Sequence, residues 1–300
     1  GILIPPSVVL VISAILTEQN IIKLFLAAMV PGVLAAIGYM VTIAVYVRLK
    51  PDSAGQRDRA GYGERFSALV SVWPVLVIFG LVIGGIYAGF FNPTPAAAVG
   101  VFLVWAYGAA RRGLGWAELK DSLLEAARTT GMIYLILLGA EMLKIFMSRA
   151  GVPQATAEWI GQSGMDPMLV MVLLLLGLIV LGCLMDSLSM ILLVIPFFWP
   201  VLVEINGGLY QGAEGAGYGM STEDLKVWFG ILSLIVVELG LITPPVGLNV
   251  FVISALAKDI PMIQTFKGVA PFFGAEMVRV VVLLLFPAIT LWLPHLLGGG

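Results

Sequence analysis

Long, uninterrupted runs of apolar residues dominate the pattern of hydrophobic and polar positions along this chain. A helix needs about 20 apolar residues to cross the hydrocarbon core of a bilayer, and most of the runs reach that length. Apolar and polar residues do not alternate within them, so they predict membrane-spanning helices and exclude a β-barrel. The runs cover 1–16, 24–47, 67–91, 95–110, 130–148, 168–203, 227–257 and 272–297.

Two of the runs are too long for one regular span. A continuous helix over 168–203 would be about 54 Å long, nearly twice the hydrocarbon thickness, and its only polar interruption is 186–189. We therefore predict a re-entrant hairpin over 168–203 with its tip at 186–189. In the run 227–257, Pro244-Pro245 removes two backbone donors, which predicts two half-helices joined by an unwound turn.

Charges in the loops give the orientation, because short cytoplasmic loops are rich in Lys and Arg. Basic residues cluster in 48–65 and after the runs that end at 110 and 257, whereas 204–224 has four acidic residues and neither Lys nor Arg. The stretch 204–224 should face outward, so the run 168–203 begins and ends on one face, as a hairpin requires. Between 114 and 128, apolar and charged residues take opposite helical faces, which predicts a separate interfacial helix.

The beginning of the chain repeats the region of the di-proline break. Residues 1–14 resemble 240–255, with Pro5-Pro6 matching Pro244-Pro245 and a shared Val-Ile-Ser-Ala at the end. By the charge rule the two copies run in opposite directions, and inverted repeats with discontinuous helices are typical of secondary transporters. We expect 1–61 to be the end of the first repeat with its cytoplasmic loop, and 62–300 to be the second. The first hairpin should belong to a preceding part of the protein.

Composition removes several classes of function. With 60% hydrophobic residues, 11% charged residues and a mean hydropathy of +1.04, the chain has a lipid bilayer as its solvent. A net charge of −2 without a basic stripe argues against nucleic acid as a partner. Cys183, the single cysteine, is predicted to be a small buried apolar residue, and His295, the single histidine, cannot supply a histidine metal site or Ser-His catalysis. No enzyme and no cofactor are expected.

Polar residues inside the apolar runs are the candidates for chemistry. Asp186 is costly at membrane depth, and Ser187, Ser189, Thr243 and Asn249 add neutral oxygens, a set that suits sodium. Alternatively, Asp186 serves only to cap a hairpin arm, and both roles can coexist.

Other charged residues in the apolar runs give three further expectations. Glu238, two residues before the break, is another intramembrane charge, and Glu141 with Lys144 is expected to form a structural ion pair. We expect no arginine at membrane depth. An intramembrane aspartyl protease would need two facing aspartates, and only Asp186 lies deep.

Five segments together resemble the large membrane subunit of tripartite ATP-independent periplasmic (TRAP) transporters, the DctM-type permease. The resemblance extends over essentially all 300 residues. It implies a multi-pass protein of the bacterial inner membrane, an elevator-type secondary transporter of the ion-transporter superfamily. The segments that carry the resemblance are 1–7, 24–32, 84–100, 181–189 and 241–249.

The resemblance also implies partners and a site. A periplasmic substrate-binding protein would deliver an organic acid, a small membrane subunit would brace the large one, and sodium would drive import. One sodium would lie between the hairpin tip and the broken helix, and Ile4, Pro5 and Ser7 would line the matching site of the first repeat. The residues implied for the second-repeat site are Asp186, Ser187, Ser189, Thr243, Pro244, Gly247 and Asn249.

Two other transport readings stay open from the sequence. A stand-alone sodium/dicarboxylate symporter of similar architecture would need no binding protein. A passive channel would show neither saturation nor dependence on a sodium gradient.

Overall fold

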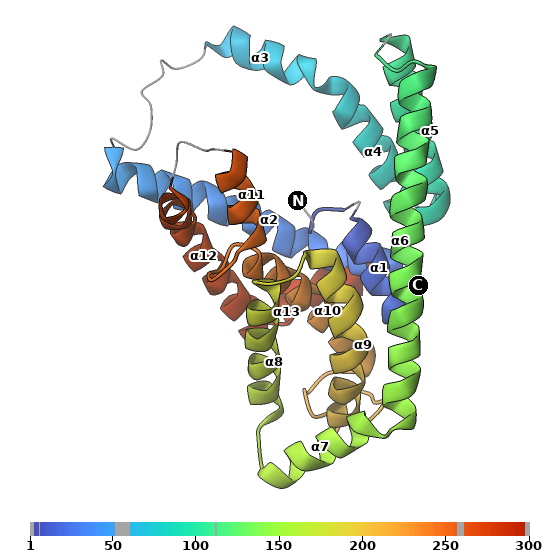
Figure 1. The fold of residues 1–300 in the computed structure, drawn as a ribbon, viewed down its shortest axis with the longest axis vertical. Coiled ribbons are helices and arrows are strands. Elements are labelled where there is room, and N and C mark those ends of the chain that lie inside the picture. The colour runs from blue at the N-terminus through green and yellow to red at the C-terminus, as the bar shows by residue number, and fades with distance from the viewer. Residues whose placement is uncertain (1–2, 6, 52–60, 112, 257–260, 298–300) are drawn as a thin grey trace. The chain divides into compact units, whose positions relative to one another are not determined.

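The computed structural model describes residues 3–5, 7–51, 61–111, 113–256 and 261–297, and within these ranges the regular structure is entirely helical. The prediction of an all-α protein is confirmed. Figure 1 shows the α-helices, which are α1 (Val8–Leu16), α2 (Ile21–Leu49), α3 (Tyr62–Ser71), α4 (Trp73–Tyr87), α5 (Pro93–Ala110), α6 (Trp116–Arg149), α7 (Val152–Ser163), α8 (Pro167–Gly182), α9 (Ser187–Asn206), α10 (Thr222–Gly240), α11 (Leu248–Leu256), α12 (Met262–Leu285) and α13 (Ala288–Leu297).

Several of these helices can cross a membrane. Among the described residues, α2, α5, α6 and α12 are each long and apolar enough for a span, and the pair α3 and α4 passes the same test as one bent unit. The chain is therefore a polytopic membrane protein. The apolar run at 67–91 lies within this pair, and the structure adds a bend of 52° where α3 and α4 meet at Val72. Pro74 lies in the first turn of α4, where its missing N–H would have no intrahelical partner, so the residue favours a new helix start at this bend.

The chain divides into two compact units, one of Gly1–Leu49 with Ile136–Gly300 and the other of Lys50–Leu135. In the second unit, α4 packs against α5. A Cβ added to Gly100 of α5 would lie 3.3 Å from a methyl group of Val82, so the two helices approach closely where glycine leaves room.

Helix α10 is the centre of the first unit. It contacts α2, α8, α9, α12 and α13, and nearly all of its side chains are buried. The Trp228 side chain is fully buried, and its indole N–H donates to the Leu283 carbonyl of α12 over 2.9 Å. Because a buried indole N–H without a partner is costly, this bond fixes α10 against α12.

Helices α8 and α9 form the predicted hairpin. Figure 1 shows the chain rising through α8, reversing at 183–186 and returning through α9. The tip was predicted at 186–189, but Ser187 already begins α9, so the turn lies three residues earlier. The shift follows from Asp186, which caps α9 and thereby starts the helix immediately after it.

Two other boundaries differ from the prediction. The interfacial helix expected at 114–128 is not separate, because α6 continues from Trp116 to Arg149 without a break. The region joining the two predicted segments contains Gly131 but no proline, and a helix tolerates a single glycine at a cost of about 1 kcal/mol. The run 272–297 is interrupted at Phe286-Pro287, where α12 ends and α13 begins, since Pro287 cannot donate to the helix ladder.

Candidate functional site

The break between α10 and α11 is built by Pro244-Pro245 and Gly247. The residues between Gly240 and Leu248 are not helical, so carbonyl groups that a continuous helix would use are free to bind elsewhere. Gly247 has φ +57°, the left-handed region that glycine adopts without strain. A Cβ at this position would lie 3.1 Å from the Thr243 carbonyl oxygen and 3.4 Å from that of Leu241. Two backbone carbonyls therefore converge on the one residue that presents no side chain.

Local hydrogen bonds hold the break in shape. The Thr243 hydroxyl donates to the Leu239 carbonyl over 2.6 Å, and the Asn249 backbone N–H donates to the Leu241 carbonyl over 3.1 Å. The Phe251 N–H donates to the Gly247 carbonyl over 2.9 Å, which starts the ladder of α11. Thus the end of α10 and the start of α11 are tied together across the unwound residues.

At the hairpin turn, Asp186 is the N-cap of α9. Its carboxylate accepts from the Ser189 backbone N–H over 3.0 Å, and Ser187 and Ser189 lie in the first turn that follows. The capping role considered from the sequence is therefore present. Asp186 is exposed at the tip of the hairpin.

The hairpin turn contacts the break directly. The Cys183 thiol donates to the Pro244 carbonyl over 3.4 Å as well as to Ile179 in its own helix. Beside it, Gly182 and Gly240 approach so closely that a Cβ on Gly240 would lie 2.6 Å from the Gly182 Cα. Cys183 is buried, as predicted, but it also joins the two elements of the candidate site.

The first-repeat residues occupy a comparable local setting. Ser7 is buried and caps α1, its hydroxyl accepting from the Leu10 backbone N–H over 3.3 Å. Leu3–Pro5 are not helical, and a Cβ on Gly32 of α2 would lie 3.2 Å from the Ile4 side chain. Pro6, the match to Pro245, lies outside the described residues. Since α1 packs against α9, this segment adjoins the same hairpin.

The structure thus brings the turn at 183–186 onto Pro244 and places α1 against the hairpin. Among the described residues, the hydrogen bonds of Asp186, Thr243 and Asn249 remain within their own segments. Coordination of a shared cation by these groups stays a prediction.

Sequence reasoning missed an arginine in α12. Arg279 lies inside this candidate span with its side chain only 10% exposed, so the expectation of no arginine at membrane depth was wrong. Its guanidinium pairs with Glu276 one turn away and donates to the Pro31 carbonyl of α2 over 3.2 Å. The spacing Glu-x-x-Arg in an apolar run was the signal, because such a pair compensates its own charge.

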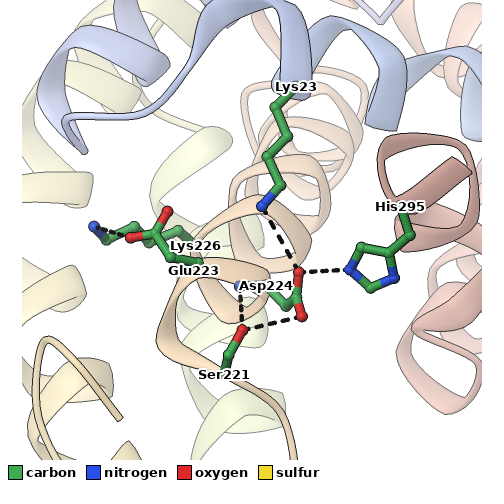
Figure 2. Close-up of polar contacts among 6 residues, drawn as sticks. All are labelled: Lys23, Ser221, Glu223, Asp224, Lys226 and His295. Atoms are coloured by element: carbon green, nitrogen blue, oxygen red, sulfur yellow. Dashed lines mark hydrogen bonds and ion pairs between the residues drawn. The ribbon is translucent and has the colours of Figure 1, made fainter. Parts of the chain in front are cut away.

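A second missed cluster joins three helix ends. Figure 2 shows Lys23 of α2, Asp224 of α10 and His295 of α13 pointing toward one another, with Asp224 at the centre. The Asp224 carboxylate lies 2.8 Å from His295 Nε2 and 3.9 Å from Lys23 Nζ, and it also accepts from the Ser221 hydroxyl over 3.0 Å. The sequence could not reveal this cluster, because its members are about 70 to 270 residues apart along the chain.

The predicted ion pair of Lys144 with Glu141 is present, and Glu18 also pairs with Lys144. Lys144 Nζ lies 3.7 Å from Glu141 and 3.0 Å from Glu18, which sits in the turn before α2. The Lys144 ammonium bonds to the Glu18 carboxylate and lowers its pKa below the ordinary value.

Comparison with known proteins gives one consistent result. Residues 1–289 match the family described as the tripartite ATP-independent periplasmic transporter, DctM component. The chain is 33% identical over 300 residues to the C4-dicarboxylate TRAP transporter large permease protein DctM of Pseudomonas aeruginosa, and that match covers 99% of this chain.

Two further relatives carry other names. The sialic acid TRAP transporter large permease protein SiaM of Vibrio cholerae is 30% identical over 100% of this chain. The ectoine TRAP transporter large permease protein TeaC of Halomonas elongata is 30% identical over 98% of it. The chain spans 65%, 66% and 64% of the lengths of these three relatives, respectively.

Proposed function

Because this chain belongs to the DctM component family of tripartite ATP-independent periplasmic transporters, we propose that it forms most of the large membrane subunit of a sodium-coupled importer of organic acids. The named compounds of the relatives, a C4-dicarboxylate, sialic acid and ectoine, all carry a carboxylate. The substrate class we assign is therefore a small organic acid, and the membrane is the bacterial inner membrane.

Two protein partners follow from the word tripartite in the family description. A periplasmic binding protein would capture the acid and deliver it to the outward face. A small membrane subunit would hold the non-moving helices of this chain. The polytopic helical fold supports the membrane part of this assembly.

The contact between the hairpin turn and the broken helix is the observation that supports a cation site. Unwound backbone at membrane depth is tolerated where it lines a site, and its freed carbonyls and helix ends can coordinate sodium. In the site that we propose, the hairpin turn at Cys183 closes on Pro244, while the carbonyls of Leu241 and Thr243 converge at Gly247. The proposed ligating segments are Asp186, Ser187 and Ser189 on one side and Thr243, Pro244, Gly247 and Asn249 on the other.

The first-repeat site would be the inverted counterpart. Ile4, Pro5 and Ser7 lie before α1 as 243–247 lie before α11, and each break leads into a nine-residue helix. The hairpin that would face this site is expected in the part of the relatives' length that this chain does not span.

An elevator motion would use these elements as one body. The hairpin, α10 and both breaks would cross the membrane together, carrying sodium and acid, while other helices stay fixed. Each sodium entering would gain about 2.3 kcal/mol per 100 mV of membrane potential, which is enough to drive accumulation without ATP.

Reconstitution into liposomes tests the tripartite assignment. Full-length large subunit, small subunit and binding protein together should take up labelled acid only with an inward sodium gradient. Uptake by the large subunit alone, undiminished when the binding protein is omitted, would instead establish the stand-alone symporter. Uptake that neither saturates nor follows the sodium gradient would indicate a channel.

Matched variants test the cation site. Asp186→Ala should abolish sodium-dependent uptake, whereas Asp166→Ala should not, although Asp166 caps the other arm of the same hairpin with a bond of 2.7 Å to the Met168 N–H. Each substitution removes one N-cap, worth about 1 kcal/mol, so the difference between them isolates the role of the tip. Equal sodium dependence in both variants would remove Asp186 from the site.

Thr243→Ala is paired with Thr156→Ala in the same way. The Thr156 hydroxyl of α7 donates to the Val152 carbonyl over 2.7 Å. Like the Thr243 hydroxyl, it bonds to the carbonyl four residues earlier, but it lies in a helix away from the break. Only Thr243→Ala should change the sodium concentration needed for half-maximal uptake.

A further inference from the structure

A pocket of about 700 Å³ lies in the first unit, between the start of α10 and α13. Its wall is formed by the loop before α10, the first turn of α10 and side chains of α13. Most of the lining side chains are apolar, while Asp224 and His295 supply the charged groups. This volume and this mixture of side chains are typical of a ligand site.

The pocket lies at the level where two candidate spans begin and end. Pro287, one of the lining residues, follows α12, which ends at Leu285. Lys23, which pairs with the lining residue Asp224, lies in the first turn of α2. Since α2 and α12 are both candidate spans, the start of one and the end of the other mark a boundary between membrane and water. The charge pattern predicts that this boundary is the outer one.

Asp224 fixes the orientation of the His295 ring. His295 Nε2 lies 2.8 Å from the Asp224 carboxylate, and Figure 2 shows the other ring nitrogen on the side of the ring away from Asp224. Among the described residues, this nitrogen, Nδ1, has no hydrogen-bond partner, and the His295 side chain is 56% exposed. Nδ1 is therefore available to a ligand in the pocket that His295 lines.

Two basic side chains share the single Asp224 carboxylate. Lys23 Nζ lies 3.9 Å from the same oxygen, Oδ1, that contacts His295, and the other oxygen accepts from the Ser221 hydroxyl over 3.0 Å. Asp224 offsets one positive charge, and a protonated His295 adds a second. The cluster then has one positive charge in excess, which an anionic ligand can balance.

The apolar part of the pocket is formed mainly by α13. Leu291 lies in the wall, and Trp292 and Leu296 beside it are 59% and 61% exposed. A small polar acid would leave these side chains in contact with water, whereas an acyl chain would cover them. Tryptophan is also enriched at membrane–water interfaces. The pocket thus combines a cluster that accepts an anion with a surface that fits a lipid chain.

We propose that this pocket binds an anionic phospholipid, with its phosphate at His295 and one acyl chain along Leu291, Trp292 and Leu296. Phosphate oxygens accept charge-assisted hydrogen bonds from an imidazolium N–H, and the net negative headgroup balances the excess charge of the cluster. Phosphatidylcholine has the same phosphate but carries a compensating ammonium group, so it should bind more weakly. The bound lipid would hold the end of α13 beside the start of α10.

Photo-crosslinking of the purified full-length protein tests the site, and about pH 6 suits the assay because histidine takes up its proton in this range. The probe is phosphatidylglycerol with a diazirine in one acyl chain, and mass spectrometry locates the labelled peptide. The peptide that contains Trp292 should be labelled in the wild type, and excess unlabelled phosphatidylglycerol should reduce this labelling. The same probe with a phosphatidylcholine headgroup should label it about fivefold less, the factor expected for one surface charge near an anionic lipid.

Two variants and a control separate the headgroup contact from general contact with lipid. His295→Gln removes the charge of the ring and should reduce labelling by about fivefold. Ala288→Trp fills the pocket from an exposed position, so it should block the probe without removing a buried contact, and it serves as the second variant if His295→Gln does not fold. Lys144→Gln is the control, because it removes a positive charge that pairs with Glu18 and Glu141 outside the pocket, and it should label like the wild type.

Three results would overturn the proposal. The first is the absence of labelling at the Trp292 peptide in the wild type. The second is equal labelling by the two headgroups or in all variants, which would mean that lipid covers α13 without recognition by His295. The third is competition by glycerol phosphate or by a soluble dicarboxylate as strong as that by phosphatidylglycerol, which would assign the pocket to a free anion.

Discussion

Replacing Gly240 by alanine should separate the hairpin from the broken helix. Gly240 ends α10, and it faces Gly182 at the end of α8. A Cβ at position 240 would lie 2.6 Å from the Gly182 Cα, 2.8 Å from its carbonyl carbon and 2.9 Å from the Ile179 carbonyl oxygen. All three atoms belong to the backbone, so no side chain can rotate away to make room.

The size of the effect follows from these distances. Non-bonded carbon atoms rest about 3.5–4.0 Å apart, so the two backbones must move apart by about 1 Å. Overpacking of this kind costs about 1–3 kcal/mol. The bond of 3.4 Å between Cys183 and Pro244 lies directly beside the contact and should break with the same displacement.

Gly177→Ala is the control, because it adds the same methyl group to α8 where nothing lies within 4 Å. An alanine in a helix interior is favoured over glycine by about 1 kcal/mol, so Gly177→Ala should be neutral or slightly stabilising. The thermal unfolding midpoint of the purified protein should therefore fall for Gly240→Ala and hold or rise for Gly177→Ala.

Cys183 reports the displacement directly. It is 3% exposed in the structure, so a maleimide should label it slowly in the wild type and in Gly177→Ala. Labelling of the peptide that contains Cys183, followed by mass spectrometry, should be much faster in Gly240→Ala. Equal labelling rates and equal midpoints in the two variants would show that the close approach of the glycines does not hold the hairpin against the break.

Three further predictions concern polar contacts elsewhere. Arg279→Met should lower the free energy of unfolding by about 3–5 kcal/mol, because it leaves the buried Glu276 carboxylate without its cation, and adding Glu276→Gln should recover part of the loss. Asn206→Ala should lower the free energy of unfolding by about 1–3 kcal/mol, because the buried Asn206 side chain bonds to Met220, Thr222 and Tyr218. The loop between α9 and α10 would lose all of these bonds together. Faster hydrogen exchange at the Tyr218 amide would report this loss. The contact of Glu18 with Lys144 should contribute under about 1 kcal/mol because Glu18 is exposed. Since the pKa of Glu18 is lowered from 4.5, this contribution is present above pH 4.5 and is lost as the pH falls through the lowered value, so Glu18→Gln should melt with a weaker acid dependence than the wild type.

The sequence predicted those parts of the site that depend on local backbone chemistry. Two adjacent prolines break a helix, so the sequence alone predicted the position of the break at Pro244. The hairpin followed from length, since an apolar run of 36 residues is too long for one span. The turn lies three residues before the predicted tip, because Asp186 caps α9 and the serines that follow it belong to the first helical turn.

Features that depend on tertiary contacts were beyond the sequence. The approach of Gly182 to Gly240 and the bond from Cys183 to Pro244 join segments about 60 residues apart. Arg279 was overlooked because its partner, Glu276, lies in the same helix and removes the net charge that would have marked it. Continuity of α6 depends on the balance of weak helix propensities near Gly131, which no single residue decides.

The contact of Gly182 with Gly240 also sets the register between two helices. Sliding α8 along α10 by one residue in either direction would bring Leu181 or Leu239 into a space that holds no Cβ. The two glycines therefore fix the axial register of α8 against α10. A shift by one residue would produce a steric clash. Any rearrangement that keeps this alignment must carry α8 and α10 as a single piece, and one that abandons it must first lift the helices apart.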